Sequence, residues 1–161
     1  MTSEALIDYV KGLLGDKTKW ADPEAGDNFL TVASEDWKNI CQTLATDKKC
    51  SLTYLRNFTG TDYPEDDEIE LTAHTFSYSE KHGLIIKTRI SREAAVCDTL
   101  SKIWPAAIWY EREIFDLLGV SFNNHPDLRR ILMPEDWVGH PLRKDYKQQE
   151  TYRGIPTTRP A

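Results

Sequence analysis

Two basic pairs, at 129–130 and 143–144, are the residues of this sequence best suited to molecular recognition. Each pair follows a His-Pro dipeptide and a leucine, with the dipeptides at 125–126 and 140–141. Arginine offers forked N–H donors that bind carboxylates and carbonyl oxygens, and a proline-restricted turn can aim those donors in one direction. We therefore expect these pairs to bind acidic or carbonyl groups.

The segment that carries both pairs, residues 125–146, cannot form a helix of useful length. Pro126, Pro134 and Pro141 each remove a backbone donor and push the preceding residue away from helical dihedrals. We expect an extended ribbon, and its charged residues and aromatic anchors have the composition of a protein interface. The predicted interface residues are His125, Asp127, Arg129, Arg130, Trp137, His140, Arg143, Lys144, Asp145 and Tyr146. The alternative is that the arginines pair with the protein's own acidic groups and the ribbon only closes a small domain.

The rest of the chain has the length and composition of one domain. The 161 residues of the chain are 40% hydrophobic, which suffices for one core. We assign residues 1–124 to that domain, residues 125–146 to the ribbon and residues 147–161 to a C-terminal arm. The arm has no apolar periodicity, so we expect partners to order it. The formal net charge of −6 argues against a nucleic-acid partner, which requires a basic face.

The three cysteines, Cys41, Cys50 and Cys97, show no spacing typical of a metal site. Their odd number and the absence of an apolar leader favour a reducing compartment. No apolar run approaches the ~20 residues that cross a bilayer, so we expect any membrane association to pass through a partner. We also expect no metal or cofactor ligands in this chain.

Apolar spacing outside the ribbon predicts helices over 6–14 and 37–44 and strands over 29–32, 52–57, 69–78 and 84–90. The last two strands flank a turn at 80–83 and should form a hairpin. Residues 61–68 are expected to be a solvated acidic turn, and residues 98–103 a short helix. An amphipathic helix must cover another element, so the pattern indicates an α+β fold with a mostly antiparallel sheet covered by amphipathic helices.

A further helix over 105–119 places Glu111 on the centre line of its apolar stripe. A lone buried carboxylate is costly, so it must ionise against a buried cation or stay protonated. Nine residues separate this helix from Arg129, which is enough for the chain to return along the helix. We therefore predict an ion pair between Glu111 and Arg129 or Arg130 that locks the ribbon onto the helix.

Other polar residues that stand out are expected to have ordinary structural roles. Arg112 and Asp116 point away from the apolar stripe and fit solvated helix charges. His82 lies in the predicted hairpin turn. His74 falls in mid-strand, where the sequence places no nucleophile or acidic residue beside it.

The motif WPAAIWYEREIFDLLGVSF, residues 104–122, is followed by NNHPDLRRILMPEDWVGHPLRKDY, residues 123–146. Together they resemble the signature of the C subunit of NADH–quinone oxidoreductase, respiratory complex I. The similarity is specific and nearly continuous from Trp104 to Tyr146, whereas residues 1–100 share only a similar αβ pattern. One departure is Ile108, where the family usually has Asn or Asp, and it leaves the core of the motif intact.

This resemblance implies a structural subunit in the peripheral arm of the enzyme. Such a protein has no catalytic, cofactor-binding or metal-binding residues of its own, and it lies against the D subunit, which carries the quinone site, and near the B subunit. FMN, iron–sulfur clusters and quinone are expected in partner subunits of this proton-translocating complex, at the cytoplasmic face of the bacterial inner membrane. The residues agree, because the sequence shows no phosphate-binding glycine loop and no nucleophile paired with a base.

Two other functions fit parts of the sequence. An equivalent subunit of a ferredoxin-dependent photosynthetic complex or of a membrane-bound hydrogenase would share the fold. Neighbouring genes for NADH-binding and flavin-binding subunits would argue against that assignment. An independent acid–base enzyme using His125 or His140 with Asp145 and an arginine-bound anion would need a pocket and turnover by the isolated chain.

Overall fold

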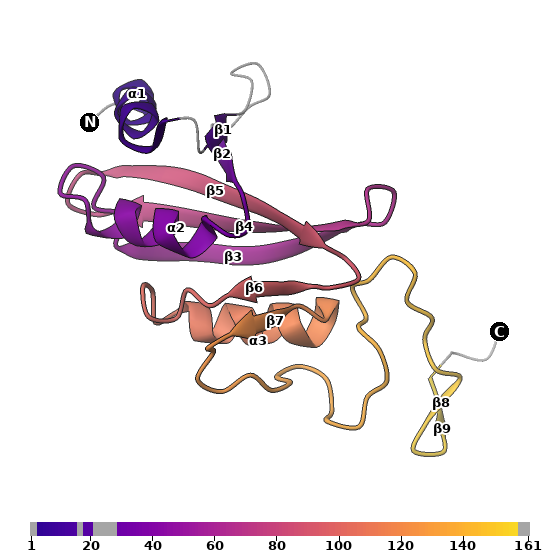
Figure 1. Cartoon of the computed structure of the whole chain (residues 1–161). Helices are drawn as coiled ribbons and strands as arrows, with labels where there is room; N and C mark the ends of the chain where they lie inside the picture. Colours follow the sequence, from indigo (N-terminus) through magenta and orange to yellow (C-terminus); the bar gives the residue numbers. More distant parts are fainter. Residues whose placement is uncertain (1–2, 16–17, 21–28, 158–161) are drawn as a thin grey trace.

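The computed structural model describes residues 3–15, 18–20 and 29–157 of the chain. Its elements in chain order are α1 (Ser3–Leu14), β1 (Thr18–Trp20), β2 (Phe29–Val32), α2 (Trp37–Thr46), β3 (Tyr54–Tyr63), β4 (Glu68–Ser77), β5 (His82–Ser91), β6 (Val96–Asp98), α3 (Ala107–Leu118), β7 (Ser121–Asn123), β8 (Thr151–Tyr152) and β9 (Ile155–Pro156). A five-stranded sheet lies between α1 at one end of the molecule and α3 at the other (Figure 1). None of the described helices has the length and apolar character of a membrane span.

The main sheet has the strand order β1-β2-β5-β4-β3. Only β2 and β5 run parallel, and the other neighbouring pairs are antiparallel. The predicted hairpin is the pair β4–β5, which is in register from Glu68 opposite Ser91 to Ser77 opposite His82. These findings confirm the α+β fold with a mostly antiparallel sheet.

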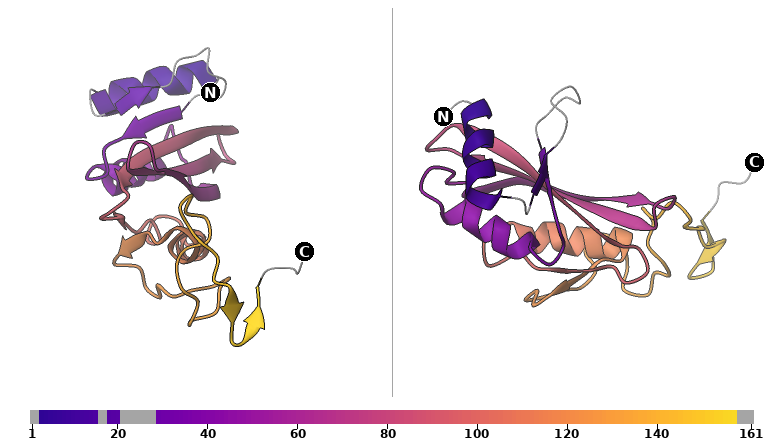
Figure 2. Two further views of the ribbon diagram at one scale, coloured as in Figure 1. Left: turned by 90° about the vertical axis from the view of Figure 1, so that its right-hand side faces the viewer. Right: turned by 45° about the horizontal axis from the view of Figure 1, so that its top comes forward.

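The apolar stripes predicted on the first two helices contribute to the core. Their buried members are Leu6 and Val10 on α1 and Trp37, Ile40, Cys41 and Leu44 on α2. The two helices are joined by the hydroxyl of Tyr9, which donates to Asp47 at the end of α2 at 3.0 Å. Further views show α1 at the β1–β2 end of the sheet and α2 alongside the strands (Figure 2).

The third helix, α3, packs closely against β3. A Cβ added at Gly60 of β3 would lie 2.6 Å from Cδ1 of Leu118, so a larger residue would require the side chain of Leu118 to shift. Near the start of the helix, the indole N–H of Trp104 donates to the carbonyl of Leu52 at 2.9 Å. Gly119 ends the helix in the left-handed conformation, with φ of 75°, as its position after the last periodic residue predicts.

The acidic turn is shorter than expected. β3 continues through Tyr63, so the turn before β4 is confined to residues 64–67. Asp62, expected to be solvated there, pairs with Ile69 across the β3–β4 ladder and is buried. Its charge needs a partner, which the structure supplies from the loop after β5.

The short helix expected over 98–103 does not form. Residues 96–98 are β6, which pairs in parallel with β7, and residues 101–103 form a turn. Strands of three residues are too short to produce a periodic signal. The sequence therefore contains little information on this second, two-stranded sheet.

The ribbon, residues 125–146, contains neither helix nor strand. It follows α3 and leads to a hairpin formed by β8 and β9 (Figure 1). This hairpin belongs to the predicted C-terminal arm and packs on the ribbon, where the rings of Tyr152 and Trp137 lie 5.1 Å apart. The hydroxyl of Tyr152 also donates to Asp136 at 2.7 Å. The last four residues of the predicted arm, 158–161, lie outside the described residues.

Candidate protein interface formed by the ribbon and α3

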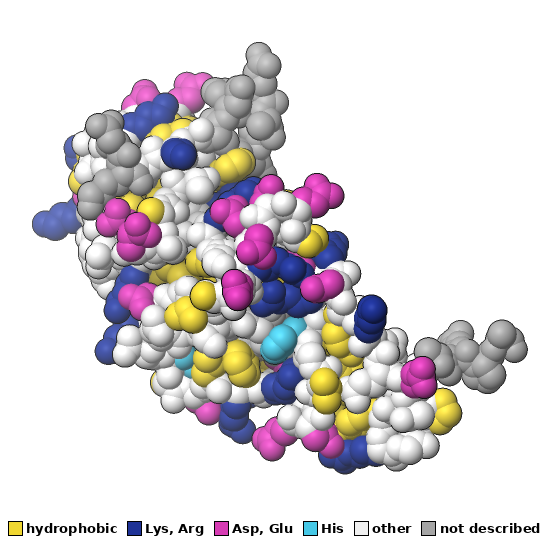
Figure 3. Space-filling view, turned by 45° about the vertical axis from the view of Figure 1, so that its right-hand side comes forward, with side chains coloured by type: hydrophobic (Ala, Val, Ile, Leu, Met, Phe, Trp, Pro, Cys, Tyr) yellow, Lys and Arg dark blue, Asp and Glu magenta, His cyan; other side chains and the backbone are white. Residues whose placement is uncertain are grey.

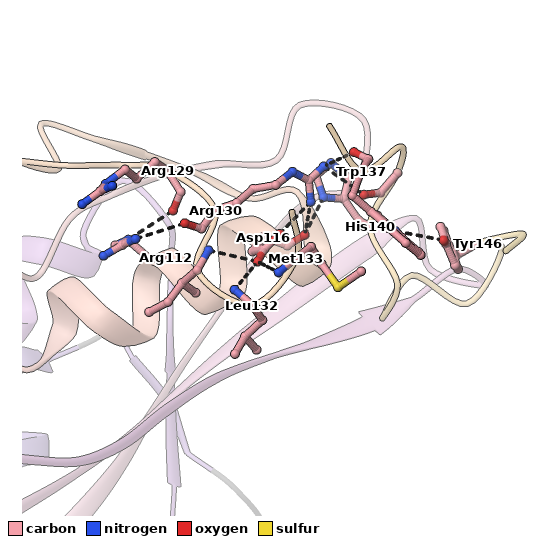
Figure 4. A network of polar contacts seen from close by, with 11 residues as sticks. Arg112, Asp116, Arg129, Arg130, Leu132, Met133, Trp137, His140 and Tyr146 are labelled. Carbon is pink, nitrogen blue, oxygen red and sulfur yellow. Dashed lines mark hydrogen bonds and ion pairs between the residues drawn. The ribbon is translucent and has the colours of Figure 1, made fainter. Parts of the chain in front are cut away.

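The buried carboxylate of Asp116 is the main attachment point of the ribbon on α3. Its Oδ2 accepts three successive backbone N–H groups, from Ile131 at 3.1 Å, Leu132 at 2.7 Å and Met133 at 2.8 Å. Its Oδ1 lies 2.6 Å from Nη1 of Arg130 (Figure 4). Burial alone would raise the pKa of Asp116, but these hydrogen bonds outweigh it and hold the pKa below its usual value. The carboxylate therefore stays ionised and orders the ribbon backbone.

Arg112, one helical turn before Asp116, binds the same stretch of the ribbon through its carbonyl groups. Its Nε donates to the carbonyl of Arg129 at 3.1 Å, and its Nη2 donates to the carbonyl of Arg130 at 3.0 Å. Both helix residues are buried, so the expectation of solvated charges was wrong. The i, i+4 spacing places them on one face, but the same spacing is common in exposed pairs. The proline-rich segment that follows has backbone groups without partners in a helix or sheet, which indicates that some side chains must bind them but does not identify those side chains.

Arg130 fixes a second bend of the ribbon. Its Nη2 donates to the carbonyls of Trp137 at 3.0 Å and Gly139 at 3.1 Å. The guanidinium thus joins Asp116 on the helix to two points further along the ribbon, as Figure 4 shows. Arg130, which was predicted to contact a partner, therefore binds groups of its own chain and fixes the bend of the ribbon.

His140 packs against the end of α3. One ring nitrogen, Nδ1, lies 3.0 Å from the carbonyl oxygen of Asp116. The ring also covers Gly119, where an added Cβ would lie 2.6 Å from Cδ2 of His140. Gly119 is therefore required both for its left-handed backbone and for the space that the ribbon occupies.

The next part of the ribbon satisfies carbonyl groups that the end of α3 leaves without helical partners. The backbone N–H of Leu142 donates to the carbonyl of Leu117 at 2.9 Å. Nε of Arg143 donates to the carbonyl of Leu118 at 2.5 Å, and its Nη1 donates to the carbonyl of Arg92 at 3.2 Å. Arg143, the first residue of the second basic pair, therefore binds the end of the helix and connects it to the loop after β5.

Asp62 and Arg92 attach the end of the ribbon to the main sheet. Nε of Arg92 lies 2.6 Å from Oδ1 of Asp62, and its Nη2 lies 2.7 Å from Oδ1 of Asp145. The backbone N–H of Lys144 donates to Oδ2 of Asp62 at 2.8 Å. The hydrogen bonds from Arg92 lower the pKa of Asp62 more than burial raises it. The ribbon is thus held by two buried carboxylates, one on α3 and one on β3.

Glu111 is buried on the apolar stripe of α3, as the sequence predicts, but it has different partners. Its Oε2 accepts the hydroxyl of Thr99 at 2.5 Å, and its Oε1 accepts the backbone N–H of Leu100 at 2.7 Å. Burial raises the pKa of Glu111 to about 7, although both hydrogen bonds oppose this shift. The carboxyl group is therefore close to half protonated at neutral pH.

The predicted ion pair of Glu111 with Arg129 or Arg130 does not form. Arg129 pairs instead with Asp127 on the surface, at 2.9 Å, and Arg130 pairs with Asp116. The physical reason is that the carboxylate oxygens of Glu111 are directed at the connection between β6 and α3, where Thr99 and Leu100 donate to them. Arginine does lock the ribbon onto α3, but the carboxylate is one that we expected to be solvated.

His125, the first residue of the ribbon, contacts α3 through its imidazole ring. Its Nδ1 accepts the backbone N–H of Asp127 at 3.0 Å, so its proton is on Nε2, which donates to the carbonyl of Ile108 at 3.1 Å. The same nitrogen lies 3.8 Å from Glu111, with both side chains buried. Ile108, the position that departs from the family pattern, thus contributes its backbone to this contact.

The outward side of the ribbon is mixed apolar and charged. Leu132 and Val138 are 61% and 66% exposed, and neither was on the predicted interface. Of the predicted residues, Asp127, Arg129, Lys144 and Asp145 are exposed, and Trp137 and Tyr146 are half-buried and hydrogen-bonded to each other at 3.1 Å. Figure 3 shows apolar side chains scattered among charged ones over the C-terminal part of the chain, beside the grey C-terminus.

The residues considered for acid–base catalysis are not brought together. The side chain of His125 is buried, His140 covers the end of α3, and Asp145 is bound to Arg92. Burial raises the pKa values of the buried thiols, to about 12 for two of them, so they stay protonated at neutral pH. Within the described part of the chain, no three His, Cys, Asp or Glu side chains are grouped so that they could hold a metal ion.

Comparison with known proteins confirms the resemblance seen in the sequence. Residues 30–152 match a family described as "Respiratory-chain NADH dehydrogenase, 30 Kd subunit". The C subunit of NADH-quinone oxidoreductase from Chlorobium phaeobacteroides is 38% identical over 153 residues, which cover 94% of this chain and 92% of that protein. The protein of the same name from Geobacter metallireducens is 44% identical over 137 residues, covering 80% and 82%.

Two solved structures share the fold. A trypsin-resistant fragment of Nqo5 has a TM-score of 0.63 at 20% identity, covering 80% of this chain and 100% of the fragment. A chain of an archaeal membrane-bound sulfane sulfur reductase has a TM-score of 0.67 at 21% identity, covering 89% and 85%. The family match spans the main sheet apart from β1, together with α3 and the ribbon. The chain therefore belongs to the family of the 30-kDa subunit of respiratory-chain NADH dehydrogenase.

Proposed function

We propose that this chain is a non-catalytic structural subunit in the peripheral arm of a proton-translocating NADH–quinone oxidoreductase. The observation that carries the proposal is the similarity to relatives named as the C subunit of NADH-quinone oxidoreductase, which extends over nearly the whole chain. In this role the chain docks on the D subunit, which carries the quinone site, and lies near the B subunit. FMN, iron–sulfur clusters and quinone belong to its partners, and the complex holds this chain at the cytoplasmic face of the bacterial inner membrane.

The contacts of the ribbon explain how a segment without secondary structure can serve as an interface. Asp116, Arg112 and Asp62 satisfy backbone groups of the ribbon within the chain itself. A surface that is already ordered loses less conformational entropy on binding than a segment that folds on its partner. The exposed apolar side chains Leu132 and Val138 are then available to fill pockets of the quinone-site subunit.

Purification of the tagged chain from its own membranes tests this function. We expect the tag to recover the B and D subunits together with FMN, iron–sulfur clusters and NADH-dependent quinone reduction. Recovery of the chain alone as an inert soluble protein would contradict the proposal. A complex that reduces its acceptor with ferredoxin and not with NADH would assign the chain to the related class of complexes instead.

A further inference from the structure

Beyond the ribbon, α3 presents a large aromatic side chain to solvent. Trp109 is 61% exposed, whereas Trp37 and Trp104 are almost fully buried. An exposed tryptophan carries a large apolar surface, and tryptophan is among the residues most enriched at the energetic centres of protein interfaces. Its position on a rigid helix makes this ring a candidate anchor rather than part of the core.

The ring of Trp109 contacts Arg112, the side chain of α3 that binds the ribbon. The guanidinium carbon of Arg112 lies 5.3 Å from the centre of the ring, within the range of a cation–π contact. Two ribbon carbonyls fix that guanidinium, those of Arg129 and Arg130. The ribbon therefore fixes the arginine against which the ring of Trp109 lies.

The charges around Trp109 indicate what a partner must offer. Glu113, one helical turn further along α3, is exposed, and no hydrogen bond or ion pair of its carboxylate is found among the described residues. The N–H donors of the neighbouring arginines are already used, because Arg112 binds carbonyl groups and Arg129 binds Asp127. The surface therefore combines an apolar ring with an exposed carboxylate that has no partner among the described residues.

We propose that Trp109 and Glu113 form a second docking point of this chain, which inserts the indole into an apolar pocket rimmed by an arginine or lysine of a partner subunit. The proposal rests on the proposed function, since it assumes assembly into a multisubunit complex. Pro105 and Ala106, at i−4 and i−3 from the ring, are small and exposed, so they leave room for the walls of such a pocket. The basic rim lies beside Glu113, and the contact continues the surface of the ribbon.

Competition during assembly tests the docking point in the intact complex. Cells would express the untagged wild-type chain together with a tagged variant, and the share of variant in the purified complex would be measured. We expect Trp109→Ala to lower that share at least tenfold relative to tagged wild type, and Glu113→Lys to lower it several-fold. The matched controls are Tyr78→Ala, an aromatic residue that is 67% exposed in the β4–β5 turn, and Glu80→Lys in the same turn. Incorporation of the Trp109 and Glu113 variants at the level of the controls would overturn the proposal.

Hydroxyl-radical footprinting gives a second measurement that needs no substitution. We expect oxidation of Trp109 to fall at least fivefold when the wild-type chain is in the complex rather than alone. Equal oxidation of Trp109 in both states would overturn the docking point while leaving membership of the complex intact. A tagged wild-type chain that enters no complex would instead overturn the proposed function together with this inference.

Discussion

Asp116 of α3 and Arg130 of the ribbon form a buried ion pair, with 2.6 Å between Oδ1 and Nη1, while the other carboxylate oxygen accepts three backbone N–H groups. Asp116 therefore binds each of the four successive ribbon residues 130–133. The ribbon takes its shape from the chain's own helix, so a partner meets a surface that is already formed.

Replacing Asp116 by Asn tests this attachment. The substitution leaves Arg130 without its counter-charge. It also leaves the three backbone N–H groups with a weaker acceptor than a carboxylate oxygen. Breaking a buried pair from one side costs about 3–5 kcal/mol. We expect the free energy of unfolding to fall by that order and protease cleavage within residues 125–146 to accelerate. Asp127→Asn, which breaks an exposed pair with Arg129, is the control and should leave both measurements unchanged.

Glu111 gives the chain a pH-dependent stability. Its pKa of about 7 in the folded chain exceeds the ordinary value of 4.5, so the folded state binds a proton that the unfolded state releases. The resulting stabilisation is complete below about pH 4.5 and is lost as the pH rises through 7, a change of about 3 kcal/mol.

Denaturant unfolding of wild type and Glu111→Gln between pH 4.5 and 8 measures this contribution. Glutamine keeps an acceptor for Leu100 but cannot titrate. We expect wild type to lose stability relative to Glu111→Gln as the pH rises through 7. Parallel pH profiles would show that Glu111 has an ordinary pKa in the folded chain.

Gly119→Ala should displace His140. Alanine would be strained at φ of 75°, and its Cβ would lie 2.6 Å from the imidazole ring. Gly15→Ala, directly after α1, is the matched control, because its φ of 59° is also left-handed but no atom lies within 4 Å of an added Cβ. The left-handed strain alone costs about 1–2 kcal/mol. Calorimetry should show a larger loss of stability for Gly119→Ala, and equal losses would mean that the imidazole moves away freely.

Removing residues 147–161 should leave the domain folded and weaken assembly. The described part of the arm contacts the ribbon mainly through Tyr152 and Arg153, which bind Asp136 on the surface. We expect the melting temperature of the truncated chain to stay within a few degrees of wild type, while its recovery in the membrane complex declines. A large fall in melting temperature would show that the arm belongs to the core.

The sequence was sufficient to predict the elements in which apolar residues recur regularly over a long stretch. The stripes of α1, α2 and α3, the β4–β5 hairpin and the burial of Glu111 all follow from spacing alone. The spacing of apolar residues predicts which residues are buried, but it does not predict which segment of the chain covers them. Glu111 was therefore assigned to the wrong partner, because its donors, Thr99 and Leu100, lie in a connection without periodicity.

The roles of Arg112 and Asp116 could not be predicted for a related reason. Their burial depends on where the ribbon returns, and that path is set by hydrogen bonds to backbone groups, which every residue except proline offers equally. Asp62 is a similar case, since its burial depends on Arg92, 30 residues away in the chain. Contacts of this kind need the tertiary structure.

Photo-cross-linking from Leu132, which is 61% exposed on the outward side of the ribbon, tests the central claim most directly. A photoreactive amino acid at this position, activated in native membranes, should join the chain to the quinone-site subunit, as mass spectrometry of the linked peptides would show. That result would place the preformed ribbon at the predicted interface. A fully assembled complex in which position 132 gives no cross-link to the quinone-site protein would contradict the account.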